Sequence, residues 1–328
     1  MSTAATLDAA DFGRPGTAAT AAADVSKVGL NGWPVAASSS SSSPPPAAMA
    51  TSSSAAGVAG AGRSITGTTE VRTVPSPLFP TIASALEQPS MVALDSNSSP
   101  SRCAVPNLVV RVLSGVYYEE LVISHPVVLV GADEALPTIH GTGVDGVRVA
   151  TGAGGGLCCA LRKLRFVAEP QGRALTVDNC SPLVESCEVL GPGGDPVRGA
   201  PPGLLVKGAD AQPVFRGCRI SGHAAAGLSF VHGASGVVVG CDISSCACGV
   251  WLDGKANPLL WRNTIAGHRG AGVVIRADAQ GTVMGNTVLR NGAGGVLVES
   301  TRSSLAKILQ NRVWSNIGWD LRQSPSAA

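Results

Sequence analysis

Short stretches of alternating apolar and polar residues occupy most of this chain, and glycines and small polar residues separate them. An apolar side chain at every second position is typical of a β-strand, and stretches this short do not support helices. From Leu164 onward the alternation returns every 22 to 25 residues, apart from one longer gap. A nearly fixed interval of this size predicts a solenoid in which each repeat is one coil.

Each repeat contains two recognisable parts. The first part is Cys or Asn, then any residue, then Ile or Val, and the second part is Gly-apolar-x-apolar. The first part occurs at Cys187–Val189, Cys218–Ile220, Cys241–Ile243, Asn263–Ile265, Asn286–Val288 and Asn311–Val313. The second part occurs at Gly203–Val206, Gly227–Phe230, Gly249–Leu252, Gly272–Ile275, Gly295–Val298 and Gly318–Leu321.

A single coil cannot bury its own apolar face, but stacked coils can, because each strand pairs with its equivalent in the next coil. Parallel strands in register lie about 4.8 Å apart, so equivalent side chains form straight columns. The pattern therefore predicts an all-β fold, a parallel β-helix solenoid. The leading glycine of the second part suits a bend with little space or with a positive φ.

The repeats predict four inward columns. One is the corner column Cys187, Cys218, Cys241, Asn263, Asn286 and Asn311, in which stacked asparagines hydrogen-bond to one another. Two columns come from the glycine strand: Leu204, Leu228, Val250, Val273, Val296 and Trp319, and then Val206, Phe230, Leu252, Ile275, Val298 and Leu321. The fourth comes from the strand before the corner: Val184, Phe215, Val238, Leu260 and Val283.

The sequence also predicts the elements at the start of the solenoid. We expect strands at 108–112, 115–119, 121–123, 127–131 and 138–141, and a short helix at 81–87 that caps the first coil. This series has the form strand, Gly-x-Tyr-x-Glu, strand, Pro-Val-x-Leu-x-Gly, Thr-Ile-x-Gly. The longer gap holds a Gly- and Pro-rich insertion at 191–202, which is either a recognition loop or a tolerated surface insertion.

The opening series resembles the first coil of the pectin-lyase-like superfamily of right-handed parallel β-helices. The later coils resemble the repeats of CASH domains, which occur in carbohydrate-active proteins and in F-box-only β-helix proteins. The resemblance covers roughly residues 80 to 323 and includes the segment Asn286–Val296. It implies a fold and not an activity, because these motifs are structural. We see no F-box-like helical segment before the β-helix.

The first part of the chain has a different composition. Ala, Gly, Ser and Thr dominate it, and a serine run at 38–43 precedes three prolines. Such a segment buries too little apolar surface to offset its ordering entropy. We therefore predict a disordered tail at 1–73, the β-helix at 74–323 and a short tail at 324–328.

Charge and composition narrow the function classes. The formal net charge is +2, aromatic residues make up 4%, and no basic stripe is visible, so we do not expect nucleic-acid binding. No apolar run is long enough to span a membrane, and we expect no membrane association. The chain has no secretory-signal pattern, and its cysteines favour buried free thiols in a reducing compartment. We therefore expect a cytoplasmic protein, and organellar targeting stays open.

The outward positions of the repeats offer one candidate catalytic group. Asp253, Arg276 and Glu299 fall in line on successive coils and form the best catalytic constellation that the pattern offers. A ladder of alternating charges between stacked coils explains the same three residues and is the favoured interpretation. The histidines occupy different loops or coil positions, so no nucleophile–base pair emerges. We expect no metal and no cofactor.

Apolar residues at outward positions are the more unusual feature. Seven of them form a candidate partner-binding patch: Leu205, Val239, Trp251, Trp261, Val274, Met284 and Leu297. Tryptophan is frequent at binding hot spots, and it also stacks on sugar rings.

Two functions remain open from the sequence. The favoured one is a non-catalytic intracellular scaffold that binds a protein partner along one face of the β-helix. The other is a carbohydrate-active enzyme of the lyase, hydrolase or epimerase type, so a glycan ligand stays possible. We also expect an uncapped last coil, which offers an edge for self-association.

Overall fold

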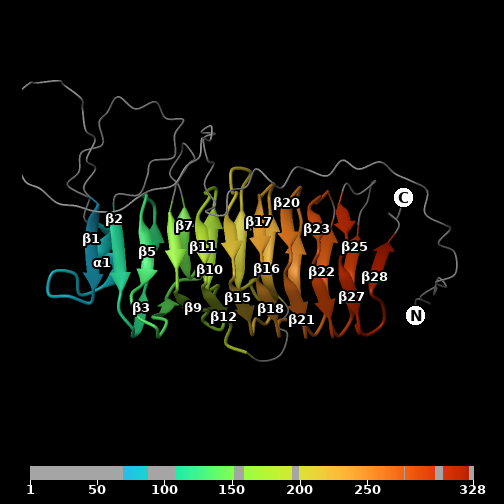
Figure 1. The fold of residues 1–328 in the computed structure, drawn as a ribbon, viewed down its shortest axis with the longest axis horizontal. Coiled ribbons are helices and arrows are strands. Elements are labelled where there is room, and N and C mark those ends of the chain that lie inside the picture. The colour runs from blue at the N-terminus through green and yellow to red at the C-terminus, as the bar shows by residue number, and fades with distance from the viewer. Residues whose placement is uncertain are drawn as a thin grey trace, which may run out of the picture. The chain divides into compact units, whose positions relative to one another are not determined.

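The computed structural model describes residues 69–87, 108–150, 159–193, 199–276, 278–299 and 306–324. These residues form a parallel β-solenoid within the unit Gly60–Ala328. They contain one helix, α1 (Ile82–Glu87), and 28 strands. The strands stack side by side along one axis, from α1 and β2 near one end to β28 near the other (Figure 1). The predicted all-β parallel solenoid is confirmed.

Three parallel sheets form the walls. Sheet A comprises β1 (Glu70–Val74), β2 (Leu108–Val112), β5 (Val128–Gly131), β8 (Ala160–Arg162), β11 (Leu183–Glu185), β14 (Val214–Arg216), β17 (Ser235–Val239), β20 (Asn257–Trp261), β23 (Thr282–Met284) and β26 (Lys307–Leu309). Sheet B comprises β3 (Val116–Glu119), β6 (Thr138–Gly141), β9 (Arg165–Val167), β12 (Glu188–Leu190), β15 (Arg219–Ser221), β18 (Asp242–Ser244), β21 (Thr264–Ala266), β24 (Thr287–Leu289) and β27 (Arg312–Trp314). Sheet C comprises β4 (Val122–Ile123), β7 (Val147–Ala150), β10 (Leu175–Asp178), β13 (Leu204–Lys207), β16 (Ala226–Val231), β19 (Cys248–Leu252), β22 (Ala271–Arg276), β25 (Gly294–Glu299) and β28 (Leu321–Ser324).

Each coil contributes one strand to sheet A, then one to sheet B, then one to sheet C. We number the coils from 1 (β2, β3, β4) to 9 (β26, β27, β28). The predicted inward columns hold through coil 8: in sheet C, Leu204 pairs in register with Leu228, and the column continues to Val296. In sheet A the predicted inward residues of coils 4 to 8, Val184 to Val283, are fully buried.

The last coil corrects the predicted register. Val296 lies opposite Leu321 and not Trp319, and Val298 lies opposite Gln323 and not Leu321. Gly318 is therefore not the equivalent of Gly295. The amide of Gly295 donates to the carbonyl of Trp319 at 2.9 Å, and the amide of Val296 donates to that of Asp320 at 2.8 Å, so Asp320 takes the glycine position.

The corner between sheets A and B contains the predicted ladder. The side-chain Oδ1 of Asn286 accepts from the backbone amide of Asn263 at 2.9 Å and from its Nδ2 at 3.0 Å. Asn286 Nδ2 donates in turn to the carbonyl of Leu260 at 2.8 Å and to Asn311 Oδ1 at 3.0 Å. At the boundary of the cysteine half, the amide of Cys241 donates to Asn263 Oδ1 at 2.9 Å. Side-chain amides thus link coils 6 to 9 to one another.

A second buried ladder lies at the corner between sheets B and C, five residues after the first. Its members are His223, Cys246, His268, Asn291 and Asn316. His268 takes the role of asparagine: its Nδ1 accepts from the amide of Cys246 at 3.2 Å, and its Nε2 lies 3.0 Å from the carbonyl of Ile243. This geometry requires a neutral ring with its proton on Nε2.

The glycines of the second repeat part make room for this ladder. A Cβ on Gly203 would lie 2.2 Å from the ring of His223, and one on Gly249 would lie 2.7 Å from Nε2 of His268. Neither glycine has a positive φ. Of the two reasons expected for these glycines, the close approach of the next coil is the correct one.

The first coil is closed by the predicted cap. Ile82, Ala85 and Leu86 of α1 are buried against the core. The carboxylate of Glu119 accepts from the amides of Ile82 at 3.0 Å and Ala83 at 2.8 Å. The Glu of the Gly-x-Tyr-x-Glu motif therefore caps the N-terminus of α1.

The first strand of sheet A lies at the predicted junction between the tail and the β-helix. Sheet A begins at Glu70, four residues before the expected boundary at 74, because β1 pairs with β2 along its whole length. The predicted disordered tail falls mainly on residues 1–68, which lie outside the described residues, as do 194–198 of the insertion and 325–328.

Candidate interaction face

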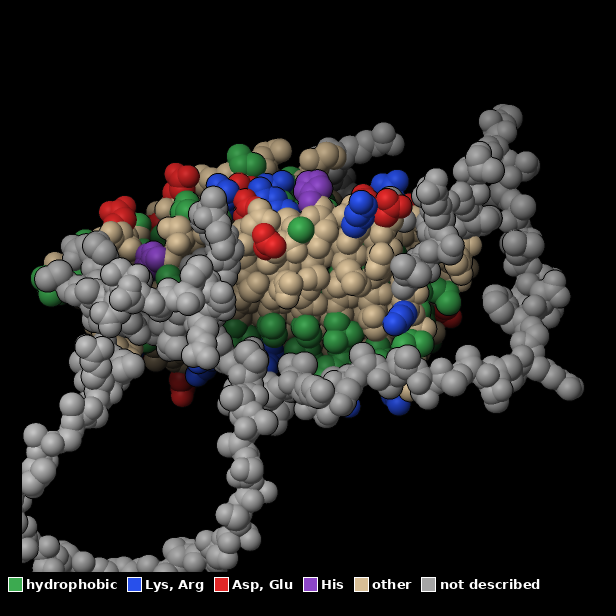
Figure 2. All heavy atoms as spheres, turned by 90° about the horizontal axis from the view of Figure 1, so that it is seen from above, with side chains coloured by type: hydrophobic (Ala, Val, Ile, Leu, Met, Phe, Trp, Pro, Cys, Tyr) green, Lys and Arg blue, Asp and Glu red, His purple; other side chains and the backbone are tan. Residues whose placement is uncertain are grey.

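The outer surface of sheet A has two columns, because each strand places its central residue inward and its two flanking residues outward. Column A1 precedes the inward residue: Val109, Val128, Ala160, Leu183, Val214, Val237, Leu259, Thr282 and Lys307. Column A2 follows it: Arg111, Val130, Arg162, Glu185, Arg216, Val239, Trp261, Met284 and Leu309. Apolar side chains are visible in a band along the solenoid at the lower edge of Figure 2.

In coils 3 to 5 column A2 is charged and paired. Glu185 Oε2 lies 3.2 Å from Arg162 Nε, and Glu185 Oε1 lies 3.2 Å from Arg216 Nη1. The carboxylate thus bridges the coils above and below it. This part of the outer face ties coils together by ion pairs.

In coils 6 to 9 column A2 is apolar. Val239, Trp261 and Met284 are half-buried, and Leu309 is 47% exposed. The guanidinium of Arg262 lies 4.6 Å from the centre of the Trp261 ring, so a cation covers part of the ring face. We call Val239, Trp261, Met284 and Leu309 the apolar column.

The structure divides the seven predicted patch residues between two sheets. Val239, Trp261 and Met284 lie in sheet A, whereas Leu205, Trp251, Val274 and Leu297 lie in sheet C. The turn after β19 separates Trp251 from Trp261 along the chain. The seven residues therefore form two columns and not one patch.

Two of the sheet C residues are less accessible than expected. Val274 is buried because it lies in register between the larger Trp251 and Leu297. Leu205 is buried too, between Thr176 and Ser229, which are themselves buried. These two side chains offer little surface to a partner.

The structure brings together only two of the three candidate catalytic residues Asp253, Arg276 and Glu299. Arg276 Nε lies 2.9 Å from Glu299 Oε2, in register on neighbouring coils. Arg276 also lies over the ring of Trp251, at 5.2 Å from its centre. The carboxylate of Asp253 accepts from the amide of Gly254 at 2.8 Å, and no ion pair joins it to Arg276 in the described residues.

A second ionic group lies on sheet C in coils 2 to 4. Asp178 Oδ2 lies 2.8 Å from Arg148 Nη2 and 3.3 Å from Lys207 Nζ. Burial alone would raise the pKa of Asp178, but hydrogen bonds from the two cations outweigh burial and lower this pKa. A carboxylate held ionised between two cations is a poor general acid.

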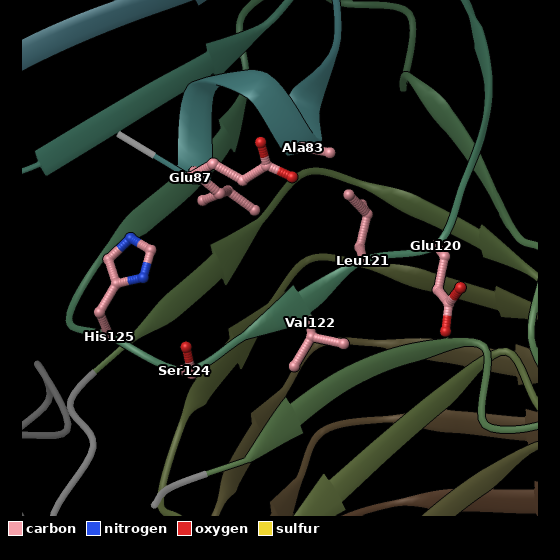
Figure 3. A pocket seen from close by; sticks show the side chains of 8 residues that line it. Ala83, Glu87, Glu120, Leu121, Val122, Ser124 and His125 are labelled. Carbon is pink, nitrogen blue, oxygen red and sulfur yellow. The ribbon is translucent and has the colours of Figure 1, made fainter. Parts of the chain in front are cut away.

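A pocket of about 400 Å³ lies between α1 and β4, lined by Ala83, Leu86, Glu87, Glu120, Leu121, Val122, Ser124 and His125. Figure 3 shows His125 and Glu120 at its two ends. Burial, together with the charge of Arg72, lowers the pKa of His125. No hydrogen bond or ion pair joins His125 to a lining carboxylate in the described chain.

The buried thiols and histidines serve the ladders. The seven described cysteines are free thiols, and six of them are buried, which confirms the expectation for this part of the chain. Burial raises the pKa of Cys246 to about 11 and that of Cys248 to about 12, so both remain protonated. No described helix has the length and apolar character to cross a membrane. Among the described residues, no three His, Cys, Asp or Glu side chains form a metal site.

Comparison with known families agrees with this architecture. A family model described as "right handed beta helix region" matches residues 145–316, which is 172 of 328 residues. The chain belongs to the right-handed beta helix family. The match begins in coil 2 and ends in coil 9 of this β-helix protein, so it covers the apolar column and both ladders. No curated protein matches the chain.

Part of the apolar outer face of this β-helix protein was not among the predicted patch residues. Val237 and Leu259 of column A1 flank the apolar column, Val214 precedes them in coil 5, and all three are half-buried. The signal was present as three consecutive apolar residues in β17 and β20, Val237–Val239 and Leu259–Trp261. A strand with one solvent-exposed face should alternate apolar and polar residues. A run of three apolar residues therefore indicates an apolar outer face as well as an inward residue.

Proposed function

We propose that this protein is a non-catalytic scaffold that binds a protein partner along the outer face of sheet A. The observation that carries the proposal is the apolar column in coils 6 to 9, beside the apolar residues of column A1. Contiguous apolar surface on a folded domain is typical of an interaction site. The family match supports a β-helix framework for such a face and is neutral about its role.

The arrangement of charges supports a binding role over catalysis. The carboxylates of the two ionic groups on sheet C are each paired with a cation in a neighbouring coil. Enzymes of the carbohydrate-active type need acid and base groups that converge on one substrate atom. Of the three residues predicted for the alternative function, a carbohydrate-active enzyme, the ion pair joins only Arg276 and Glu299.

Capture of partners from extracts of the native cell tests the proposal. We would compare the full chain with Trp261→Ala and, as a matched control, Trp251→Ala. Both residues are half-buried tryptophans with an arginine over the ring, but they lie in different sheets. We expect Trp261→Ala to lower the recovery of specific partners by about 30-fold, the effect of losing a hot-spot tryptophan.

Circular dichroism and thermal unfolding would confirm that both variants remain folded. Equal recovery with Trp261→Ala and the full chain would contradict the proposal. Loss only with Trp251→Ala would move the binding face to sheet C. Product release from a polysaccharide panel, abolished in Glu299→Gln, would replace the scaffold function with the enzymatic alternative. The expected cytoplasmic location and self-association through coil 9 stay predictions.

A further inference from the structure

The outer faces of sheets A and B change their charge balance along the solenoid. In coils 3 to 5 cations and carboxylates alternate, as in the pair Arg165–Glu188 at 2.7 Å. In coils 7 to 9 the strands of sheets A and B and the corner between them contain no carboxylate, over the described residues 257–266, 282–289 and 307–314. The next carboxylate along sheet B is Asp242 in coil 6, in register with Arg219.

Three cations remain around the apolar column in these coils. Arg262 occupies the corner and lies over Trp261, Lys307 begins β26 in column A1, and Arg312 begins β27 beside the corner. Lys307 and Arg312 are exposed, and none of the three forms an ion pair in the described chain. Cations without carboxylate partners beside apolar side chains are complementary to a ligand that carries both acidic and apolar groups.

The size of the surface limits the kind of ligand. Four coils at about 4.8 Å spacing place the ends of the apolar column about 14 Å apart, and the two outer columns are about 7 Å apart. A stable interface between two folded domains buries about 800 Å² on each partner, which is several times this surface. A single linear segment of about four extended residues or about three helical turns matches it.

We propose that the apolar column and its three cations bind a short linear segment of a partner protein in which acidic residues flank apolar ones. This inference rests on the proposed scaffold function and specifies the partner's chemistry at the same face. Apolar residues of the segment pack on Trp261, Met284 and Leu309. Its carboxylates engage Arg262 at the corner and Lys307 and Arg312 on the two flanks. The aliphatic side chains in the column favour a peptide over a polyanion such as nucleic acid, whose recognition depends on stacked bases and many phosphate contacts.

Selection from a random peptide library displayed on phage tests this chemistry without a known partner. The immobilised full chain serves as bait, and selected peptides are then synthesised and titrated by fluorescence anisotropy. We expect the selected peptides to be rich in Asp or Glu next to Leu, Ile, Phe or Trp. Their affinity should fall about tenfold or more for the triple variant Arg262→Gln/Lys307→Gln/Arg312→Gln and should weaken as salt rises.

Arg111→Gln is the matched control, because Arg111 occupies column A2 in coil 1, is exposed, and lies far along the same sheet. This variant should bind the selected peptides as the unaltered chain does. Trp261→Ala separates the two proposals. Neutral or basic peptides that lose binding in Trp261→Ala but not in the triple variant would overturn the acidic-segment inference and leave the scaffold function standing.

Two further results would also contradict the acidic-segment inference. Selected peptides unaffected by either variant, or no selected peptides at all, would contradict the acidic-segment inference, and the capture experiment with Trp261→Ala would then decide the scaffold function. A single-stranded oligonucleotide that binds more tightly than the selected peptides, and that depends on the same three cations, would replace the peptide ligand with nucleic acid.

Discussion

At sheet A and its corner with sheet B, the two halves of the solenoid place the polar links between coils on different sides of the wall. In coils 4 to 6 the corner between sheets A and B contains Cys187, Cys218 and Cys241, and the outer face of sheet A carries the ion pairs of Glu185. In coils 7 to 9 the corner contains asparagines that hydrogen-bond from coil to coil, and column A2 outside is apolar. The change inside and the change outside occur within one coil of each other.

This comparison indicates that different groups help to hold the coils in register in the two halves. Burial of one face already favours one register between parallel strands, and polar groups that hydrogen-bond in a single alignment strengthen that preference. Where buried amides supply that specificity, the outer face is free of this task and can present apolar surface to a partner. Where the corner is apolar, surface ion pairs between coils contribute instead, although each is weak.

The largest expected effect comes from removing one amide of the inner ladder. Asn286→Ala should lower the free energy of unfolding by about 4 kcal/mol. The substitution leaves the buried amide groups of Asn263 and the carbonyl of Leu260 without their hydrogen-bond partner. The equivalent change in the other half, Cys218→Ala, should cost about 1 kcal/mol, because it mainly removes a small apolar contact.

Urea unfolding followed by circular dichroism measures both values under one set of conditions. Equal losses for the two variants would show that the halves do not differ in how the corner fixes register. An Asn286→Cys variant refines the comparison, since it places the corner cysteine of coils 4 to 6 into the asparagine ladder of coils 7 to 9. Its loss should fall between those of the two alanine variants.

The second ladder gives the next largest effect, through acid. Burial lowers the pKa of His223 and of His268 to about 4, against 6.5 for an exposed histidine. Because the folded state binds protons less readily than the unfolded chain, stability is complete above pH 6.5 and falls as the pH drops from 6.5 towards 4. The loss should approach about 3 kcal/mol for each histidine.

Unfolding free energies measured across this range would test the assignment. His268→Asn keeps the ladder, because Asn291 and Asn316 fill the same position in the next two coils. This variant should lose roughly half of the acid sensitivity and keep its stability at neutral pH. An unchanged pH dependence in the double variant His223→Asn/His268→Asn would rule out the ladder as the source.

The smallest effect concerns the outer ion pairs. Glu185→Gln removes the carboxylate shared by Arg162 and Arg216, whose side chains are partly exposed. We expect a loss of about 0.5 kcal/mol that disappears at high salt, since solvent and ions screen such pairs. A loss that persists in 1 M salt would mean that Glu185 contributes through packing and not through charge.

Much of the fold was predictable from the sequence, because each inward column repeats one residue type at one spacing. Val238 and Leu260 needed only the period and the alternation to be placed. The register of coil 9 was not predictable in this way, because Gly318 imitates the glycine of the repeat while Asp320 occupies its place. Counting nine residues from the ladder residue would have located Asp320.

The interaction face was predictable only in part. Val239, Trp261 and Met284 were found because an apolar residue followed an inward one, but their separation from Trp251 depends on where the chain turns between sheets C and A. The ladder role of His268 was also missed, although His223, Asn291 and Asn316 share its position, five residues after the corner residue of their coils. That role depends on the amide of Cys246, in the preceding coil.

The fit between a glycine in one coil and a ladder residue in the next has an evolutionary consequence. Gly203 and His223, or Gly249 and His268, form one steric unit that spans a coil boundary, so neither partner can mutate freely alone. A duplication or deletion preserves every such unit only when it inserts or removes one whole period, as from Asn263 to the residue before Asn286. We therefore expect related solenoids to differ in length by whole coils.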